Sequence, residues 1–225
     1  RDYCEEVDAM VALAEENKRN SSSSYEQRVL YGNSTGALTC VTYLKHGELA
    51  STIDGLALNG PFFDWHLAAY AEVLMNSSFL TDAYAKLAVG HGGKHVQSGA
   101  GLSPYSLKTW AQYYYDVSEE SLGLRSVPCL NTTAEWAKAV TATQKALKSD
   151  GERRPFLIPI FVISSASDAW VSSDEVLATS DFLGPIRTEV QVPNAEHDVF
   201  MSTTKSKVDE CKRHLMAWLN SYFSS

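Results

Sequence analysis

Four short apolar runs stand out along the chain, and each is bounded by residues that favour turns. They are rich in β-branched and aromatic side chains, which is typical of buried strands, and they cover 28–31, 54–61, 158–163 and 188–192. The second run stops at a Gly-Pro pair, since proline has no N–H with which to continue a ladder. The pattern therefore predicts four buried strands.

Between these runs, apolar residues recur at the three- and four-residue spacing of amphipathic helices. The predicted helices cover 2–19, 37–44, 174–183 and 205–223. The face of the first helix that we expect to lie on the core gathers Tyr3, Val7, Met10, Val11 and Ala14. Strands that alternate with helices predict the α/β class, with a parallel sheet flanked by helices.

One long stretch, 61–154, breaks this alternation, because it contains no convincing strand. Its aromatic residues include Trp65, Tyr70, Tyr84, Trp110, Tyr113, Tyr114, Tyr115 and Trp136. An insertion of this length after a core strand predicts a helical cap, with a glycine-rich lid loop at 91–109. Core segments 1–60 and 155–225 would then flank the cap. For most of the aromatics, packing within the cap itself is the better interpretation.

Composition and charge narrow the classes of function. The chain has 225 residues, 44% hydrophobic and 20% charged, which is typical of a soluble globular protein with a sizeable core. A net charge of −8 offers no basic surface, so we expect neither nucleic acid nor an anionic membrane as a partner. No apolar run approaches the roughly 20 residues of a transmembrane helix.

The cysteines lack the spacing of metal ligands, and most fall in helical patterns. We therefore expect buried free thiols at Cys4, Cys40, Cys129 and Cys211. No metal or organic cofactor is indicated. Sequons at Asn20, Asn76 and Asn131 leave a secreted origin open, but such short motifs are frequent by chance, and we favour a cytoplasmic protein.

The residues Gly32-Asn33-Ser34-Thr35-Gly36 spell G-x-S-x-G between a predicted strand and a predicted helix. That context is the one required by a nucleophile elbow, in which a sharp turn exposes the serine hydroxyl. The serine backbone is strained in such a turn, and we expect a side chain at Gly32 or Gly36 to crowd the strand against the helix. Alone, the motif is more often an ordinary turn, so its partners decide the interpretation.

A serine hydroxyl needs a base to remove its proton, and the base needs an acid to orient it. On this elbow the expected chain order is serine, then acid, then histidine. Asp168 and His197 follow the third and fourth predicted strands in that order, and the carboxyl ends of parallel strands meet at one edge of a sheet. We therefore predict that Ser34, Asp168 and His197 lie together.

Each of these choices has a competitor. Asp174 is the next carboxylate after Asp168 and is the alternative acid. Glu196 and Asp198 flank His197, but adjacency in sequence makes them poor orienters of its ring. The remaining histidines fall at a helix end, in the predicted cap or on the last helix; they are His46, His66, His91, His95 and His214.

At this point the chain resembles a known family. The stretches 32–36, 56–64, 158–168 and 194–198 are similar to those of the α/β-hydrolase superfamily, from the elbow strand onward. Within it, the chain resembles the capped serine hydrolases grouped with monoglyceride lipases, lysophospholipases and serine aminopeptidases.

The resemblance implies a role for each residue of the site. Ser34 would be the nucleophile, His197 the general base and acid, and Asp168 the residue that orients it. It also implies an oxyanion hole that includes the backbone N–H of Thr35.

The second oxyanion donor of this fold comes from a loop upstream of the elbow, and only one helix and one strand precede Ser34 here. We therefore expect that donor, and the strands before it, to lie outside this chain. A separate polypeptide could supply them. The glycine pair after His91 lies downstream in the predicted cap, and we interpret it as lid flexibility.

The sequence thus favours a serine hydrolase that cleaves carboxylic esters or thioesters through an acyl-enzyme intermediate. An aromatic-rich cap favours a small apolar or aromatic substrate. Amide or peptide cleavage and acyl transfer by the same residues are alternatives. A non-catalytic ligand-binding protein on a hydrolase fold is an alternative of another class.

Overall fold

The computed structural model describes residues 2–20, 27–64, 96–97, 131–132, 134–149, 155–168, 171–202 and 205–224. The chain divides into two compact units, 1–66 together with 143–225, and 67–142. Most of the predicted cap, including all of the predicted lid loop 91–109 except 96–97, lies outside the described residues. The domain boundaries drawn from the sequence therefore stay a prediction.

The first unit is built on a parallel four-stranded sheet. Its strands are β1 (Val29–Asn33), β2 (Gly55–Asn59), β5 (Ile160–Ser165) and β6 (Arg187–Val192), in the spatial order β1-β2-β5-β6. Asn33 pairs with Asn59 at the ends of β1 and β2. Because all the strands run the same way, their carboxyl ends and the loops that follow them meet at one edge.

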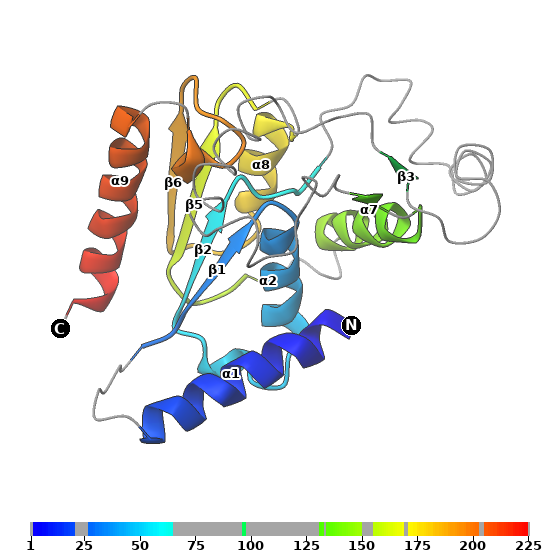
Figure 1. Ribbon diagram of the computed structural model, residues 1–225, viewed down its shortest axis with the longest axis vertical. Coiled ribbons are helices and arrows are strands. Elements are labelled where there is room, and N and C mark those ends of the chain that lie inside the picture. The colour runs from blue at the N-terminus through cyan, green and yellow to red at the C-terminus, as the bar shows by residue number, and fades with distance from the viewer. Residues whose placement is uncertain are drawn as a thin grey trace, which may run out of the picture. The chain divides into compact units, whose positions relative to one another are not determined.

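Helices cover both faces of this sheet (Figure 1). On one side lie α2 (Thr35–His46) and α8 (Ser173–Ser180), and on the other lies α9 (Lys205–Phe223). Two short 3-10 turns, η1 (Ala50–Thr52) and η3 (Val199–Met201), also belong to this unit. The predicted α/β class and the four predicted strands are confirmed.

The core follows the alternation of side chains along each strand. One cluster joins strand residues to α9 and consists of Ala57, Phe161, Ile163, Val192, Val199, Cys211 and Trp218. The Trp218 ring packs on Phe161 with ring centroids 5.6 Å apart. Strand residues whose side chains point to the other face of the sheet, such as Leu56 and Leu58, are also fully buried, so both faces of the sheet are covered.

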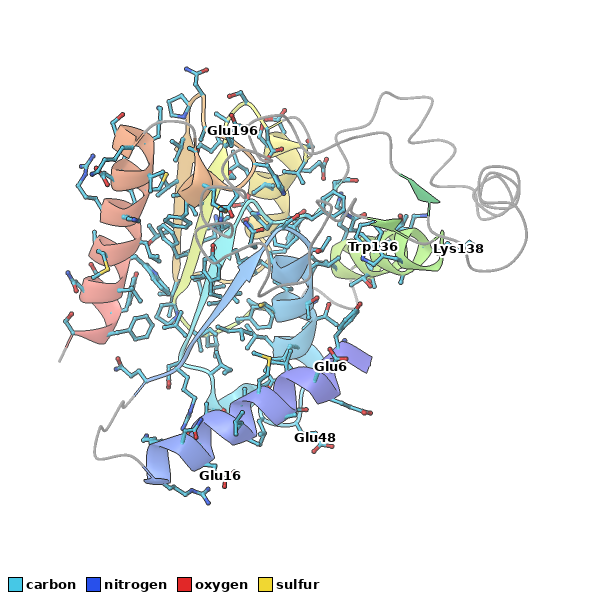
Figure 2. All side chains as sticks on the ribbon, in the orientation of Figure 1. Glu6, Glu16, Glu48, Trp136, Lys138 and Glu196 are labelled. Atoms are coloured by element: carbon cyan, nitrogen blue, oxygen red, sulfur yellow. The ribbon has the colours of Figure 1, made fainter. Side chains whose placement is uncertain are left out.

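The first helix, α1 (Asp2–Asn20), packs on α2 with a face that includes the expected Val7 and Val11 but is rotated from the one we predicted. Cys4 and Val11 are buried, whereas Tyr3 and Met10 are more than half exposed. The face is rotated because polar side chains on it find partners. Asp8 accepts hydrogen bonds from the Tyr43 hydroxyl and the Leu49 N–H, both at 2.8 Å, and Glu15 pairs with Arg28. Figure 2 shows Glu6 and Glu16 on this helix, and Glu48 near it.

The second unit contains a two-stranded antiparallel pair, β3 (Val96–Gln97) and β4 (Asn131–Thr132), which corrects the prediction that 61–154 holds no strand. Each strand has two residues, which is too short to give a period-2 pattern. The helix α7 (Ala134–Lys148) begins in this unit and ends in the first. Its last turns contact the segment that follows β2. The buried Gln144 side chain donates to the Phe62 carbonyl at 2.9 Å, and Lys148 pairs with both Asp64 and Glu175.

Among the helices of the described residues, none is long and apolar enough to cross a membrane. The expectation of buried free thiols is confirmed for Cys4, Cys40 and Cys211, whereas Cys129 lies outside the described residues.

Burial disfavours the reactive thiolate form of two of these thiols, because desolvation penalises the charged group. It raises the pKa of Cys40 from 9.0 to about 12 and that of Cys211 to about 11. At pH 8 we expect iodoacetamide to leave both unmodified in the folded protein and to alkylate both in denaturant, as measured by peptide mass spectrometry. Rapid alkylation of either one without denaturant would contradict the assigned burial.

Candidate active site

The turn between β1 and α2 places Ser34 in a conformation that side-chain-bearing residues rarely adopt. Its φ is 52° and its ψ is −120°, directly before the first residue of α2. Such a backbone costs about 1–3 kcal/mol and persists only where the surroundings hold it. This strained turn is the geometry that the G-x-S-x-G motif predicted.

Hydrogen bonds on both sides of Ser34 hold the turn. Its N–H donates to the Asn59 carbonyl at 2.9 Å, and its carbonyl accepts from Ala37 and Phe62 N–H groups, both at 3.1 Å. A typical intramolecular hydrogen bond contributes about 1 kcal/mol net, so three of them match the cost of the strain. Two of these bonds come from the chain at the end of β2, which ties the turn to the neighbouring strand.

The two glycines of the motif differ in their surroundings. A Cβ at Gly32 would lie 2.6 Å from Ala37 Cα and 2.7 Å from the Gly36 carbonyl oxygen, so this position is closed to a side chain. A Cβ at Gly36 would meet nothing within 4 Å. The expectation of crowding was therefore right for Gly32 and wrong for Gly36, which faces away from the strand–helix contact.

The structure brings the Ser34, His197 and Asp168 side chains into one chain of hydrogen bonds. His197 Nε2 lies 2.9 Å from Ser34 Oγ, and His197 Nδ1 lies 2.7 Å from Asp168 Oδ2. A carboxylate only accepts, so Nδ1 carries the hydrogen in the neutral ring and Nε2 is left to accept from the serine hydroxyl. The histidine side chain is 22% exposed and the aspartate side chain is fully buried.

Asp168 also holds its own loop, because its Oδ1 accepts from the Val171 N–H at 3.1 Å. A buried carboxylate requires such partners. The alternative acid, Asp174, lies exposed in the first turn of α8. Geometry therefore favours Asp168.

The carboxylates beside His197 have other partners. Asp198 Oδ1 accepts from the Asn59 side chain at 2.7 Å and from the Phe200 N–H at 3.1 Å, where it caps η3. Figure 2 places Glu196 at the carboxyl edge of the sheet, and its N–H donates to Ser202 Oγ at 3.0 Å. Neither residue replaces Asp168 as the partner of Nδ1.

Sequence reasoning missed the residues that join the acid loop to the histidine loop. Ser165 Oγ donates to the Ala195 carbonyl at 2.7 Å, and Ser167 Oγ accepts from the Asn194 N–H at 3.2 Å. Asn194 has a positive φ of 53°, which asparagine tolerates better than most residues. The signal was present as a serine-rich strand end, but serines there are equally typical of an ordinary loop.

Gly60 is the glycine of the Gly-Pro pair that ends the second predicted strand, and its close packing gives a further reason for a glycine there. Its φ is +50°, and a Cβ would lie 2.5 Å from the His197 carbonyl oxygen. The main chain of the histidine loop therefore approaches β2 more closely than any side chain at this position would permit.

Other histidines lie apart from this cluster. His46 is the last residue of α2, and His214 is exposed on α9, as expected. His66, His91 and His95 lie outside the described residues. Within the described part of the chain, no group of three or more His, Cys, Asp or Glu side chains could hold a metal ion.

Solved structures similar to this chain share the α/β-hydrolase fold. A monoglyceride lipase from Saccharomyces cerevisiae has a TM-score of 0.68 at 15% identity, over 97% of this chain and 68% of that one. A carboxyl esterase from Bacillus coagulans has a TM-score of 0.64 at 14% identity, over 97% and 71%. A Paleococcus ferrophilus monoacylglycerol lipase has a TM-score of 0.58 at 18% identity, over 97% and 76%. The fold is thus that of an α/β-hydrolase.

The family is shown by sequence. The model of the serine aminopeptidase family S33 matches residues 1–204, and the chain belongs to this family of α/β-hydrolases. A comparison with curated protein sequences finds no match.

The two motif glycines provide a matched pair of substitutions. We expect Gly32→Ala to lower the free energy of unfolding by about 1–3 kcal/mol, because the added carbon meets backbone atoms that cannot move aside. Gly36→Ala should leave it unchanged or raise it by up to about 1 kcal/mol, since alanine favours the helix more than glycine does. Urea unfolding followed by circular dichroism measures both. Equal destabilisation by the two variants would refute the assigned packing.

Proposed function

We propose that the protein is a serine hydrolase that cleaves carboxylic esters or thioesters through an acyl-enzyme intermediate. The observation that carries the proposal is the hydrogen-bonded series from Ser34 Oγ through His197 to Asp168, on a strained turn that presents the serine. Membership of an α/β-hydrolase family supports it.

In the first half of the reaction, Ser34 Oγ attacks the carbonyl carbon while His197 Nε2 takes the hydroxyl proton. The ring becomes positively charged, and the buried Asp168 carboxylate stabilises it through the Nδ1–H bond. The carbonyl electrons move to the oxygen. When the tetrahedral intermediate collapses, His197 returns the proton to the leaving alcohol or thiol, and an acyl-serine remains.

The Thr35 N–H is the proposed donor to the negatively charged oxygen. The first N–H groups of an α-helix have no acceptor within the helix, and Thr35 opens α2 directly after the serine. In the second half, His197 takes a proton from water, which attacks the acyl-serine, and then returns it to Ser34 as the acid leaves.

The substrate class is proposed as a small apolar or aromatic ester. Two structural neighbours are lipases of monoglyceride or monoacylglycerol and a third is a carboxyl esterase. The aromatic residues of 61–154 favour an apolar acyl or aromatic group.

A second candidate is amide or peptide cleavage by the same three residues, which the description of the matching family favours. The two differ in the leaving group, so activity on p-nitrophenyl esters and on aminoacyl p-nitroanilides separates them. Higher kcat/KM on the anilides would replace the ester proposal.

Removal of the nucleophile is the direct test. We expect a fluorophosphonate probe to label the wild-type protein and to leave Ser34→Ala unlabelled, because only an activated serine attacks phosphorus. Turnover of a p-nitrophenyl ester should fall by roughly 10⁴- to 10⁶-fold in the variant. A folded wild-type protein that the probe does not label would support the non-catalytic binding protein instead.

The choice of acid has its own matched pair. Asp168→Asn should lower kcat by about 10⁴-fold, because an amide can hold the ring in the wrong tautomer and cannot stabilise its positive charge. Asp174→Asn should leave kcat within about twofold, as a surface change usually does. Steady-state kinetics on one ester measures both, and the reverse ranking would assign the acid to Asp174.

A further inference from the structure

Asn59 is the last residue of β2, and the mechanism above gives it no role. Its side chain is fully buried and its amide group makes three hydrogen bonds. Nδ2 donates to Asp198 Oδ1 at 2.7 Å and to Tyr31 Oη at 3.0 Å, and Oδ1 accepts from the Val199 N–H at 3.3 Å. A carboxylate only accepts and a backbone N–H only donates, so the amide fits in one orientation.

The main chain of the same residue contacts the other side of the site. The Asn59 carbonyl accepts from the Ser34 N–H at 2.9 Å, and this is one of the bonds that hold the strained turn. The side-chain bonds reach Asp198 and Val199, the two residues that follow His197. One buried residue is therefore bonded both to the serine turn and to the histidine loop.

We propose that Asn59 is a positioning residue that sets the distance between Ser34 and His197. The inference rests on the proposed function, because this distance matters only if a proton passes between the two side chains. Without the amide, Asp198 and the Val199 N–H would lose buried partners, and the loop would have to move to replace them. A displacement of about 1 Å at a reacting atom can cost about 100-fold in rate.

A double-mutant cycle tests the amide–carboxylate contact. Asn59→Asp keeps the shape of the side chain and the oxygen that accepts from the Val199 N–H. It replaces the amide donor by a second carboxylate, which then faces the carboxylate of Asp198. We expect kcat for an ester to fall about 10- to 100-fold with little change in KM. Asp198→Asn alone should cost less than about threefold, because its amide oxygen can still accept from Asn59.

In the double variant the amide and the carboxylate have exchanged places. A donor again faces an acceptor, and the net charge is that of the wild type. We expect kcat to recover at least about tenfold over Asn59→Asp, although Asp198→Asn also alters the contact with Phe200. If the logarithms of the two single effects add in the double variant, or if Asn59→Asp keeps the wild-type kcat, the proposal is wrong.

A control separates positioning from stability. Ser180→Ala removes another fully buried polar contact, the 2.6 Å bond from Ser180 Oγ to the Val176 carbonyl within α8. We expect it to lower the thermal midpoint without changing kcat. An equal kcat loss in this control would mean that any buried polar change impairs the enzyme, which would overturn a specific role for Asn59.

If Asn59→Asp does not fold, Asp198→Ala serves in its place, because Asp198 is only partly buried. Its kcat should fall about tenfold with KM unchanged, and a wild-type kcat would reject the proposal.

The proposed function and the proposed role of Asn59 are refuted by different results. A wild-type protein that a fluorophosphonate does not label refutes the hydrolase, whereas a labelled wild type with an additive cycle refutes only the role of Asn59.

Discussion

The Ser34 backbone is held in its strained conformation by bonds to the chain that ends β2, and the geometry of the site depends on that attachment. Parallel strands in register bring the loops after β1, β2, β5 and β6 to one edge. Glycine, which has no side chain and tolerates a positive φ, then lets these loops approach each other closely, most clearly where Gly60 meets the His197 carbonyl. Strain at the serine, close packing at the glycine and the bonds of Asn59 thus form one connected arrangement.

Much of this arrangement could be predicted from the sequence. The strands β1, β2, β5 and β6 and the helices α1, α2, α8 and α9 could be recognised, because buried strands are rich in β-branched residues and amphipathic helices repeat apolar residues every three or four positions. The grouping of Ser34, Asp168 and His197 followed from their positions directly after strands. The role of each of these three residues remains a proposal. The buried face of α1 was predicted only in part: Val7 and Val11 lie on it, but Tyr3 and Met10 do not. Hydropathy cannot foresee that Asp8 and Glu15 turn inward toward specific partners.

Other features lay beyond any single-sequence argument. In the sequence, Asn59 looks like an ordinary turn asparagine. Only the folded structure shows that its amide donates to Asp198, far along the chain. The difference between Gly32 and Gly36 has the same origin, since a glycine in a motif does not reveal which atoms lie beside it. Long-range hydrogen bonds of this kind depend on topology more than on local pattern.

The pairing of β2 with β5 has a consequence for how such proteins diversify. Strand β2 ends at Asn59 and the next strand of this sheet, β5, begins at Ile160, which pairs with Leu56. Strand pairing therefore fixes both ends of the insertion between them. The entropy cost of closing a loop grows only with the logarithm of its length, and each doubling costs about 0.6 kcal/mol. Evolution can therefore lengthen, shorten or exchange this insertion at small thermodynamic cost, while Ser34, Asp168 and His197 keep their places at the edge of the sheet.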